Sequence, residues 1–276
     1  MHLRPRRLLC HYCGYQLPVP DTCPACRSAA FIPGGGGTEK TELVLQATFP
    51  DARILRLDHD TTRRRGSHAR ILSAFAAGEA DILVGTQMVA KGHHFPGVAL
   101  VGVLAADDSL SLPDYRAAER VFQLLTQVAG RAGRTGAGRV LLQTWQPDHP
   151  VILAAADHDY DTFALIESAQ RRVAGYPPFR RLIRLGVSGI RQGVTEHAAA
   201  QLAAALGRQL ADADRQILGP APAVFARLQG RYRHQLLIKG DLTRGEKAWV
   251  ADCCRALRDV HRSLDLVLDV DPVGLF

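Results

Sequence analysis

Residues 81–96 read DILVGTQMVAKGHHFP, and this stretch decides the fold of the central part of the chain. Its first four residues, Asp81 to Val84, form a short apolar run that predicts a buried strand. The polar segment that follows would be the loop at the carboxyl end of a parallel strand, where free N–H groups of the next helix can bind an anion. The Thr86 hydroxyl and Lys91 can add side-chain donors there. An ordinary βα loop would not need so many polar groups at one sheet edge.

Strand and helix patterns alternate on both sides of this stretch, from residue 38 to about 156. Apolar strands separated by helices predict an α/β domain whose parallel sheet is covered on both faces. Thr38 is expected to cap the first helix. The expected helices span residues 38–48, 67–77 and 113–129, and the expected strands span 54–57, 81–84, 98–104 and 140–142.

A different pattern begins after a helical linker and the breaker Gly175-Tyr176-Pro177-Pro178-Phe179. Its elements follow the order β-α-β-β-α-β, which predicts a ferredoxin-like α+β domain. The expected strands span residues 182–187, 217–228, 233–239 and 264–270, and the expected helices span 195–210 and 244–260.

Four cysteines lie within the first 32 residues, which a glycine run at 34–37 separates from the α/β part. They form two C-x2-C pairs, Cys10 with Cys13 and Cys23 with Cys26. Each pair can place two thiolates on one tetrahedral ion, so the pattern predicts zinc binding. Whether both pairs share one ion stays open. Two further cysteines, at 253 and 254, lie in an expected helix and are interpreted as core residues.

Length and composition limit the classes of protein. The 276 residues are 47% apolar, which is enough for two modest cores. Of 34 basic residues only four are lysine, and the net charge is +7, which favours nucleic acid or nucleotide partners. No run of about 18 apolar residues exists, and the start does not have the pattern of a secretory signal. An intracellular, reducing compartment is therefore expected, where cysteines bind metal more often than they form disulfides.

Residues 127–134 read QVAGRAGR and end the longest expected helix of the α/β part. The glycines Gly130 and Gly133 allow another surface to approach closely, and Arg131 and Arg134 are spaced to meet a nucleotide γ-phosphate across a cleft. A helix C-terminus neutralised by arginine would explain the charge, but it would not explain Gln127 or the glycines.

Two other segments imitate parts of a nucleotide site. Residues 34–41 read GGGGTEKT, but Glu39 stands where a P-loop has glycine, and its carboxylate would oppose the phosphates. The expected strand at 98–104 is followed by Asp107-Asp108, which imitates a strand that ends in metal-holding acids. An autonomous P-loop nucleotidase therefore remains an alternative.

Together these motifs resemble the PriA family (primosomal protein N′), the replication-restart helicases of superfamily 2. The resemblance covers essentially the whole chain. It is carried by Gly37-Thr38-Glu39, the segment Asp58-His59-Asp60-Thr61-Thr62, residues 85–96, residues 113–120 (PDYRAAER), QVAGRAGR, residues 176–179 (YPPF), residues 219–222 (GPAP), residues 230–233 (GRYR) and residues 268–272 (LDVDP).

The resemblance implies a domain plan. Residues 1–32 would be part of a zinc-binding module, residues 33–156 the second RecA-like helicase lobe, residues 157–174 a helical linker, and residues 175–276 a C-terminal DNA- and partner-binding domain. The first lobe, which carries the P-loop and the Mg²⁺-holding acids in the family, has no counterpart here. The chain is therefore expected to be a fragment or a truncated gene product that is inactive as an isolated ATPase.

The resemblance also implies residue roles. ATP with Mg²⁺ would sit between the lobes, where Arg131 and Arg134 reach its phosphates, Arg134 being the expected finger, and Gln127 contacts the nucleotide or its water. Gly130 and Gly133 belong to the same nucleotide-binding motif. Thr86, Gln87 and Lys91 would couple lobe closure to DNA phosphates. The family's zinc module holds two ions with interleaved ligands, so the two cysteine pairs would belong to different ions; a single four-cysteine site is the alternative.

The C-terminal domain offers further contacts. Arg231 and Arg233 alternate with Tyr232 on an expected strand, where they can meet the phosphates of single-stranded or forked DNA; an edge strand solubilised by arginine is the alternative. By resemblance, Arg244 and Lys247 would receive the acidic tail of single-stranded DNA-binding protein, and other primosome proteins would be partners. The protein would be cytoplasmic, bacterial and nucleoid-associated, with no membrane partner.

The function implied by the resemblance is 3′→5′ unwinding of DNA at stalled or branched forks, together with primosome assembly. The alternatives are a stand-alone zinc- and DNA-binding module and the P-loop nucleotidase.

Overall fold

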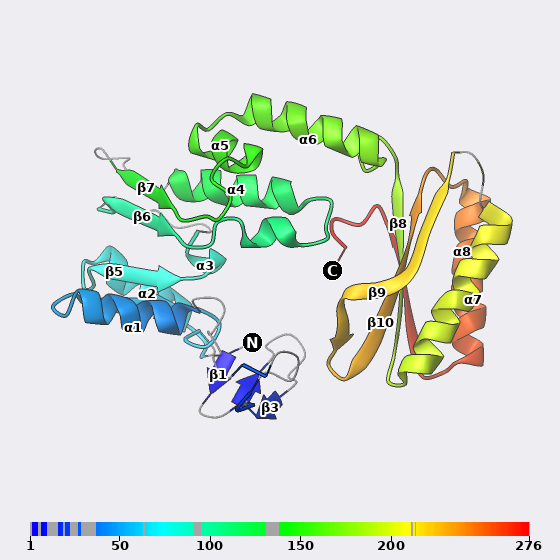
Figure 1. The fold of residues 1–276 in the computed structure, drawn as a ribbon, viewed down its shortest axis with the longest axis horizontal. Coiled ribbons are helices and arrows are strands. Elements are labelled where there is room, and N and C mark those ends of the chain that lie inside the picture. The colour runs from blue at the N-terminus through cyan, green and yellow to red at the C-terminus, as the bar shows by residue number, and fades with distance from the viewer. Residues whose placement is uncertain are drawn as a thin grey trace. The chain divides into compact units, whose positions relative to one another are not determined.

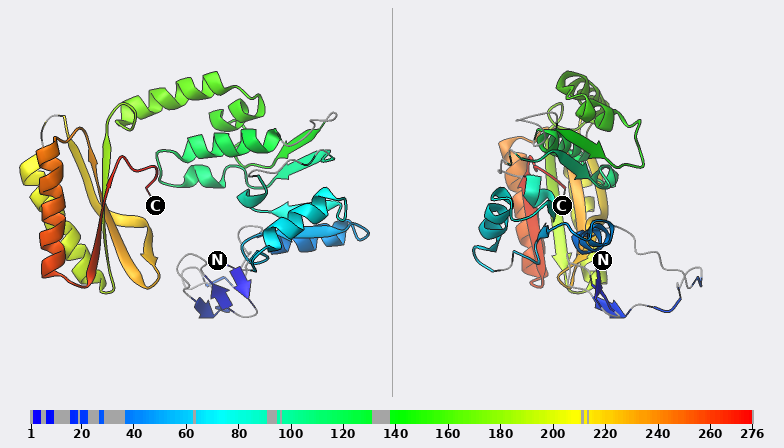
Figure 2. Two further views of the ribbon diagram at one scale, coloured as in Figure 1. Left: turned by 180° about the vertical axis from the view of Figure 1, so that it is seen from behind. Right: turned by 90° about the vertical axis from the view of Figure 1, so that its left-hand side faces the viewer.

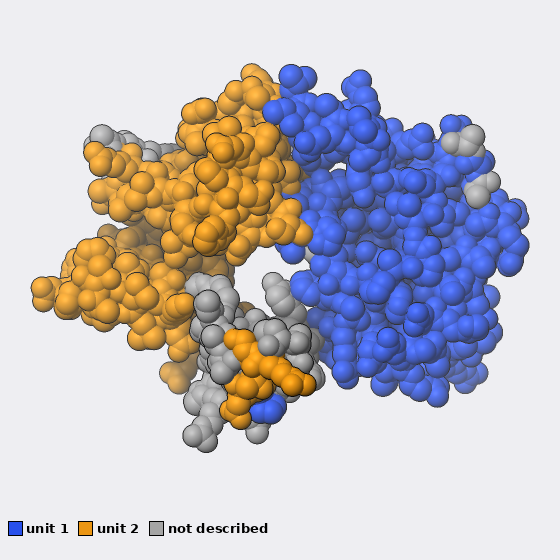
Figure 3. All heavy atoms as spheres, in the orientation of Figure 1, with its two compact units in different colours: residues 1–19, 112–117, 164–276 blue, residues 20–111, 118–163 orange. Residues whose placement is uncertain are grey.

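The computed structural model describes residues 2–4, 7–9, 16–18, 20–22, 27–28, 37–62, 64–90, 95, 97–130, 138–210, 212 and 214–275. The chain divides into two compact units (Figure 3). One contains residues 20–111 and 118–163, and the other contains residues 1–19, 112–117 and 164–276.

In the first of these units, the strands β4 (Ile54–Leu57) and β5 (Ile82–Gly85) pair in parallel. Helices α1 (Thr38–Thr48) and α2 (Ser67–Ala76) contact this pair. The apolar side chains of Leu57, Leu72 and Val84 are buried, since short apolar strands need cover on both faces. A short helix, α3 (Gln87–Ala90), follows β5 directly.

A second parallel pair is formed by β6 (Leu100–Val103) and β7 (Arg139–Leu142). Its core comes from α4 (Ala117–Ala129), α5 (Pro150–Ala156) and the start of α6 (Tyr160–Ala174). The rings of Phe122 and Phe163 stack with centroids 4.2 Å apart, which fixes α4 against α6. A 3₁₀ turn, η1 (Asp108–Ser111), follows β6.

The α/β class with parallel strands is confirmed, but several details differ from the sequence-based expectation. The described residues form two two-stranded parallel sheets and not one continuous sheet. The helix α5 was not expected; it begins at Pro150, and the side chain of His149 accepts a hydrogen bond from the backbone N–H of Val151. The expectation that Thr38 caps α1 is wrong, because Gly37 is the N-cap and the Thr38 hydroxyl is bonded to Asp58.

The other unit contains a four-stranded antiparallel sheet in the order β11-β8-β10-β9. Its strands are β8 (Leu182–Gly189), β9 (Gln216–Leu228), β10 (Arg231–Lys239) and β11 (Leu264–Val270), and its helices are α7 (Gln192–Leu210) and α8 (Arg244–Val260). Both helices cover the same face of the sheet (Figures 1 and 2). A capping box between Thr243 and Glu246 starts α8.

The N-terminal residues contribute a three-stranded antiparallel sheet of β1 (His2–Arg4), β2 (Arg7–Leu9) and β3 (Gln16–Pro18). These strands were not expected from the sequence. Among the described residues, no helix has the length and apolar character needed to cross a bilayer.

The core between the antiparallel sheet and its two helices predicts a clear difference between two leucine variants. Leu206 on α7 is 0% exposed, whereas Leu165 on α6 is 73% exposed. Leu206→Ala should lower the free energy of unfolding by about 2–5 kcal/mol, because it leaves a cavity. Leu165→Ala, the matched control, should change it by less than about 0.5 kcal/mol. Urea unfolding followed by circular dichroism measures both, and equal losses would contradict this packing.

Candidate functional site

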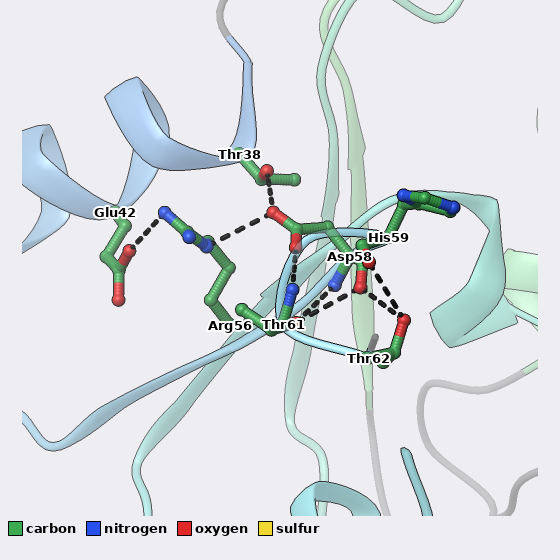
Figure 4. A network of polar contacts seen from close by, with 7 residues as sticks. All are labelled: Thr38, Glu42, Arg56, Asp58, His59, Thr61 and Thr62. Atoms are coloured by element: carbon green, nitrogen blue, oxygen red, sulfur yellow. Dashed lines mark hydrogen bonds and ion pairs between the residues drawn. The ribbon is translucent and has the colours of Figure 1, made fainter. Parts of the chain in front are cut away.

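A network of polar contacts surrounds Asp58 at the carboxyl end of β4 (Figure 4). One carboxylate oxygen, Oδ2, accepts a 2.6 Å hydrogen bond from the Thr38 hydroxyl in the first turn of α1. The other, Oδ1, accepts a 2.9 Å hydrogen bond from the backbone N–H of Thr61. This single side chain therefore joins the start of α1 to the loop after β4.

The backbone groups of Asp58 also form hydrogen bonds within the loop that follows β4. The backbone N–H of Asp58 donates to the Thr61 hydroxyl at 2.9 Å, and the Thr62 hydroxyl donates to the backbone oxygen of Asp58 at 2.6 Å. Local hydrogen bonds of this kind satisfy backbone groups that no strand partner reaches. His59, at the tip of this turn, is exposed.

Arg56 extends the network on its other side. Its Nε lies 3.1 Å from Asp58 Oδ2, and its Nη1 lies 3.0 Å from Glu42 Oε2 on α1. Asp58 is only 8% exposed. Burial alone would raise the pKa of its carboxyl, but hydrogen bonds from Thr38 and Thr61 and the charge of Arg56 outweigh it, so the net pKa is lowered. The carboxylate is therefore held ionised.

The parallel register places a second loop beside this network. Leu57 pairs with Gly85, so the residues that follow them, Asp58 and Thr86, leave the sheet at the same edge. The backbone N–H of Thr86 donates to the Leu57 oxygen at 3.4 Å. A Cβ on Gly85 would overlap the Val89 side chain and would lie 2.6 Å from the Leu57 oxygen, so this position needs glycine.

The predicted phosphate-contacting residues are only partly described. Thr86 and Gln87 are exposed, and the Thr86 hydroxyl lies 3.5 Å from the backbone N–H of Met88. Lys91 lies outside the described residues. The structure thus brings Thr86 and Gln87 to the edge that also carries Asp58, which sequence reasoning did not select as a site residue.

The QVAGRAGR motif begins on α4. Gln127 is exposed in the last turn of this helix, and Gly130 follows it, with its N–H donating to the Thr126 oxygen at 3.0 Å. Arg131, Gly133 and Arg134 lie outside the described residues, as do the four predicted zinc ligands, Cys10, Cys13, Cys23 and Cys26.

In the C-terminal sheet, Arg231 and Arg233 lie on β10 at alternate positions, so they share one face. The Arg231 Nη2 donates to the backbone oxygens of Ser188 and Ser263, both at 3.1 Å, and lies 2.8 Å from Asp265 Oδ2. The guanidinium is thus held by its own domain. Tyr232, on the opposite face, has the Arg227 guanidinium 5.1 Å from its ring centroid.

Arg233 has a basic neighbour that the sequence did not reveal. Burial lowers the pKa of Arg233, and the charge of Arg184 on β8 lowers it further. Arg184 in turn lies 3.4 Å from Asp269 on β11. The helices α7 and α8 cover the other face of this sheet in Figure 1. The strands β8 and β10 therefore bring the partly buried guanidinium groups of Arg184, Arg231 and Arg233 together on the face away from these helices.

Comparisons with known proteins match both parts of the chain. The family model of the helicase conserved C-terminal domain matches residues 37–136, and that of the primosomal protein N C-terminal domain matches residues 172–273. The replication restart protein PriA of Bacillus subtilis is 48% identical over 86% of this chain. By sequence, this chain is a PriA relative.

Other PriA proteins match over more of its length. The PriA of Chlamydia muridarum is 40% identical over 100% of the chain, and that of Haemophilus influenzae is 37% identical over 99%. The matched part is 30% of the Bacillus subtilis PriA, 37% of the Chlamydia muridarum PriA and 38% of the Haemophilus influenzae PriA. The chain therefore spans between 30% and 38% of these PriA proteins, and the resemblance expected from its motifs is confirmed.

The Asp58 network predicts a pH-dependent loss of stability. Asp58→Asn removes the charge that faces Arg56 and weakens the bond from Thr38, so the free energy of unfolding at pH 7 should fall by about 1–3 kcal/mol. Because the folded-state pKa of Asp58 lies below its unfolded value of about 4, this stabilisation is present above pH about 4 and is lost as the pH falls through the folded-state pKa. The difference between wild type and variant should shrink accordingly in urea titrations run at decreasing pH.

Asp51→Asn is the matched control, because Asp51 is an exposed carboxylate in the turn before β4. It should leave the unfolding free energy within about 0.5 kcal/mol of wild type at every pH. An Asp58→Asn variant that behaves like this control would show that the network does not stabilise the loop.

Proposed function

We propose that this chain is the C-terminal part of an ATP-dependent 3′→5′ DNA helicase that recognises stalled or branched replication forks and restarts replication by primosome assembly. The observation that carries the proposal is the tandem order of two matches in one chain, a helicase C-terminal domain at 37–136 and a primosomal protein N C-terminal domain at 172–273. A stand-alone zinc- and DNA-binding module would not need the first of them.

The proposed domain plan keeps the boundaries that the motifs indicate. Residues 1–32 are part of a zinc module, residues 33–156 a second RecA-like lobe, residues 157–174 a linker, and residues 175–276 a DNA- and partner-binding domain. The antiparallel order β11-β8-β10-β9, with both helices on one face, supports a ferredoxin-like fold for the last of these. The thiolates of Cys10, Cys13, Cys23 and Cys26 would hold Zn²⁺, and thiolate is a ligand that zinc prefers.

In the proposed mechanism, ATP with Mg²⁺ is the substrate and binds between this lobe and the first lobe of the complete protein. Arg131 and Arg134 neutralise charge on the transferred phosphoryl group, Arg134 acting as the finger. Gln127 orients the nucleotide or its attacking water, and Gly130 and Gly133 let the nucleotide approach the backbone. The exposure of Gln127 and Gly130 at the end of α4 supports this role.

DNA would be contacted at the edge where β4 and β5 end. Thr86, Gln87 and Lys91 supply hydrogen-bond donors to phosphate oxygens of the DNA. Closure of the lobes alters the position of these three residues along the DNA strand. The Asp58 network supports this assignment because it fixes the neighbouring loop and leaves the Thr86 and Gln87 side chains exposed. Repeated closure and opening would move the lobe along single-stranded DNA.

The C-terminal sheet would provide a second DNA contact. Arg233, with Arg184 beside it, carries charge on the face of β8 and β10 that lies away from the helices, whereas Arg231 is held by Asp265 and shapes that face. On α8, the exposed Arg244 and the half-buried Lys247 would receive the acidic tail of single-stranded DNA-binding protein. Other primosome proteins would be further partners. The protein would act in the bacterial cytoplasm at the nucleoid.

Residues 1–276 alone should show no DNA-stimulated ATPase activity, because they contain no P-loop. A protein extended with a first helicase lobe should hydrolyse ATP. In that protein, Arg134→Ala should reduce kcat at least about 10³-fold, since an arginine finger contributes this much to phosphoryl transfer, and DNA affinity should stay unchanged. Phosphate release measured with and without DNA tests the three statements about turnover, and fluorescence anisotropy with labelled DNA tests the affinity. Turnover by the short chain or by the extended variant would contradict the assignment.

The arginines on this face of the sheet predict a selective effect on DNA binding. Arg233→Ala should weaken binding of the chain to forked and single-stranded DNA several-fold and lower the slope of log K against log salt by about 0.7–0.9, as for one lost phosphate contact. Arg208→Ala, on an exposed position of α7 on the helical side of the sheet, is the matched control and should leave both quantities unchanged. Fluorescence anisotropy over a range of salt concentrations measures them. Equal effects of the two substitutions would argue against this face.

A further inference from the structure

The C-terminal tail contacts a segment that lies far from it in sequence. Residues 112–117 group with the unit that contains the C-terminal sheet, although residues 111 and 118 on either side belong to the other unit. They directly precede the body of α4, whose far end carries Gln127. The path of the chain into α4 is therefore set by contacts made within the C-terminal unit.

Three hydrogen bonds join this segment to the tail. The Tyr115 hydroxyl donates to the Pro272 oxygen at 2.7 Å, and the backbone N–H of Leu275 donates to Asp114 Oδ2 at 3.1 Å. The third bond runs from Arg116 Nη1 to the Val273 oxygen at 3.3 Å. Asp114 is buried, and its carboxylate accepts hydrogen bonds from the backbone N–H groups of Leu275 and Arg116.

Apolar and aromatic packing reinforces the contact. Leu275 is 4% exposed and packs in one cluster with Leu182, Leu237, Tyr115 and Tyr176. The rings of Tyr115 and Tyr176 stack at a centroid distance of 5.3 Å, with 9° between their planes.

A cation lies against each ring of this stack. Lys239 Nζ lies 3.7 Å from the Tyr176 centroid and donates to the Ala174 oxygen at 2.8 Å, while the Arg171 guanidinium carbon lies 5.3 Å from the Tyr115 centroid. Both cations and both rings belong to the same unit.

The tail is itself anchored before it reaches Tyr115. The backbone N–H of Asp271 donates to the Leu182 oxygen at 2.8 Å, and its carboxylate pairs with Arg181 at 2.5 Å. The segment that follows β11 is therefore held against β8 and the residue before it by these two contacts.

We propose that the tail Asp271–Leu275 is a latch, and that Leu275 and Tyr115 are positioning residues that fix the conformation of residues 112–117. These residues lead into α4 and belong to the same unit as the tail. The latch does not rest on the proposed function.

The test uses the full chain and needs neither ATP nor DNA. Leu275→Ala should raise hydrogen exchange of the backbone amides in residues 114–118 at least tenfold. Exchange at the centre of β8 should stay within twofold of wild type. Val273→Ala is the matched control in the same tail, because the Val273 side chain is 71% exposed, and it should change none of these quantities.

Tyr115→Phe keeps the stacked ring and removes the hydrogen bond from the hydroxyl to Pro272, so it should raise hydrogen exchange at residues 114–118 by a smaller factor. This variant replaces Leu275→Ala in the test if Leu275→Ala does not fold. Unchanged exchange at residues 114–118 would overturn the latch. Equal changes in Leu275→Ala and Val273→Ala would overturn the positioning role of Leu275. Because DNA binding does not enter this test, a failure of the chain to bind DNA would count against the proposed function alone.

Discussion

The parallel pairing of β4 with β5 is the constraint on which the candidate site depends. Because Leu57 and Gly85 are paired, both strands end at one edge, and the two loops that follow them share that edge. Such edges offer backbone N–H groups and room for a ligand, which is why binding sites in α/β proteins gather there. The contact requires a glycine at 85, since any side chain would collide with Val89 and the Leu57 backbone.

Asp58 fixes the loop that follows β4 at this shared edge. Its carboxylate satisfies donors from α1 and from its own loop, and Arg56 holds it ionised while also pairing with Glu42. A buried charge is tolerated only where it is paired and hydrogen-bonded. The same arrangement that stabilises the lobe therefore fixes the loop next to Thr86, so stability and ligand presentation are properties of one network.

Elements with local signals were predictable from the sequence, and contacts between distant residues were not. The helix Arg244–Val260 and the strand Leu264–Val270 have the predicted bounds, and the capping box of Thr243 and Glu246 shows why the helix begins where it does. The bond between Thr38 and Asp58 joins residues 20 positions apart, and a local rule assigned Thr38 to a cap instead. Likewise, the alternation of Arg231 and Arg233 indicated that both lie on one face of the strand. It did not reveal that the Arg231 guanidinium is bound by Ser263 and Asp265.

The contact between Asp114 and Leu275 is the extreme case, because 161 positions separate the two residues. Each taken alone has an ordinary interpretation, an acid near a helix start and a leucine near a chain end. Their contact has structural meaning only because the unit that holds the tail also holds residues 112–117, while the chain on either side of that segment belongs elsewhere. The conformation of residues 112–117, which lead into α4, therefore depends on the C-terminal tail and not only on signals within this segment.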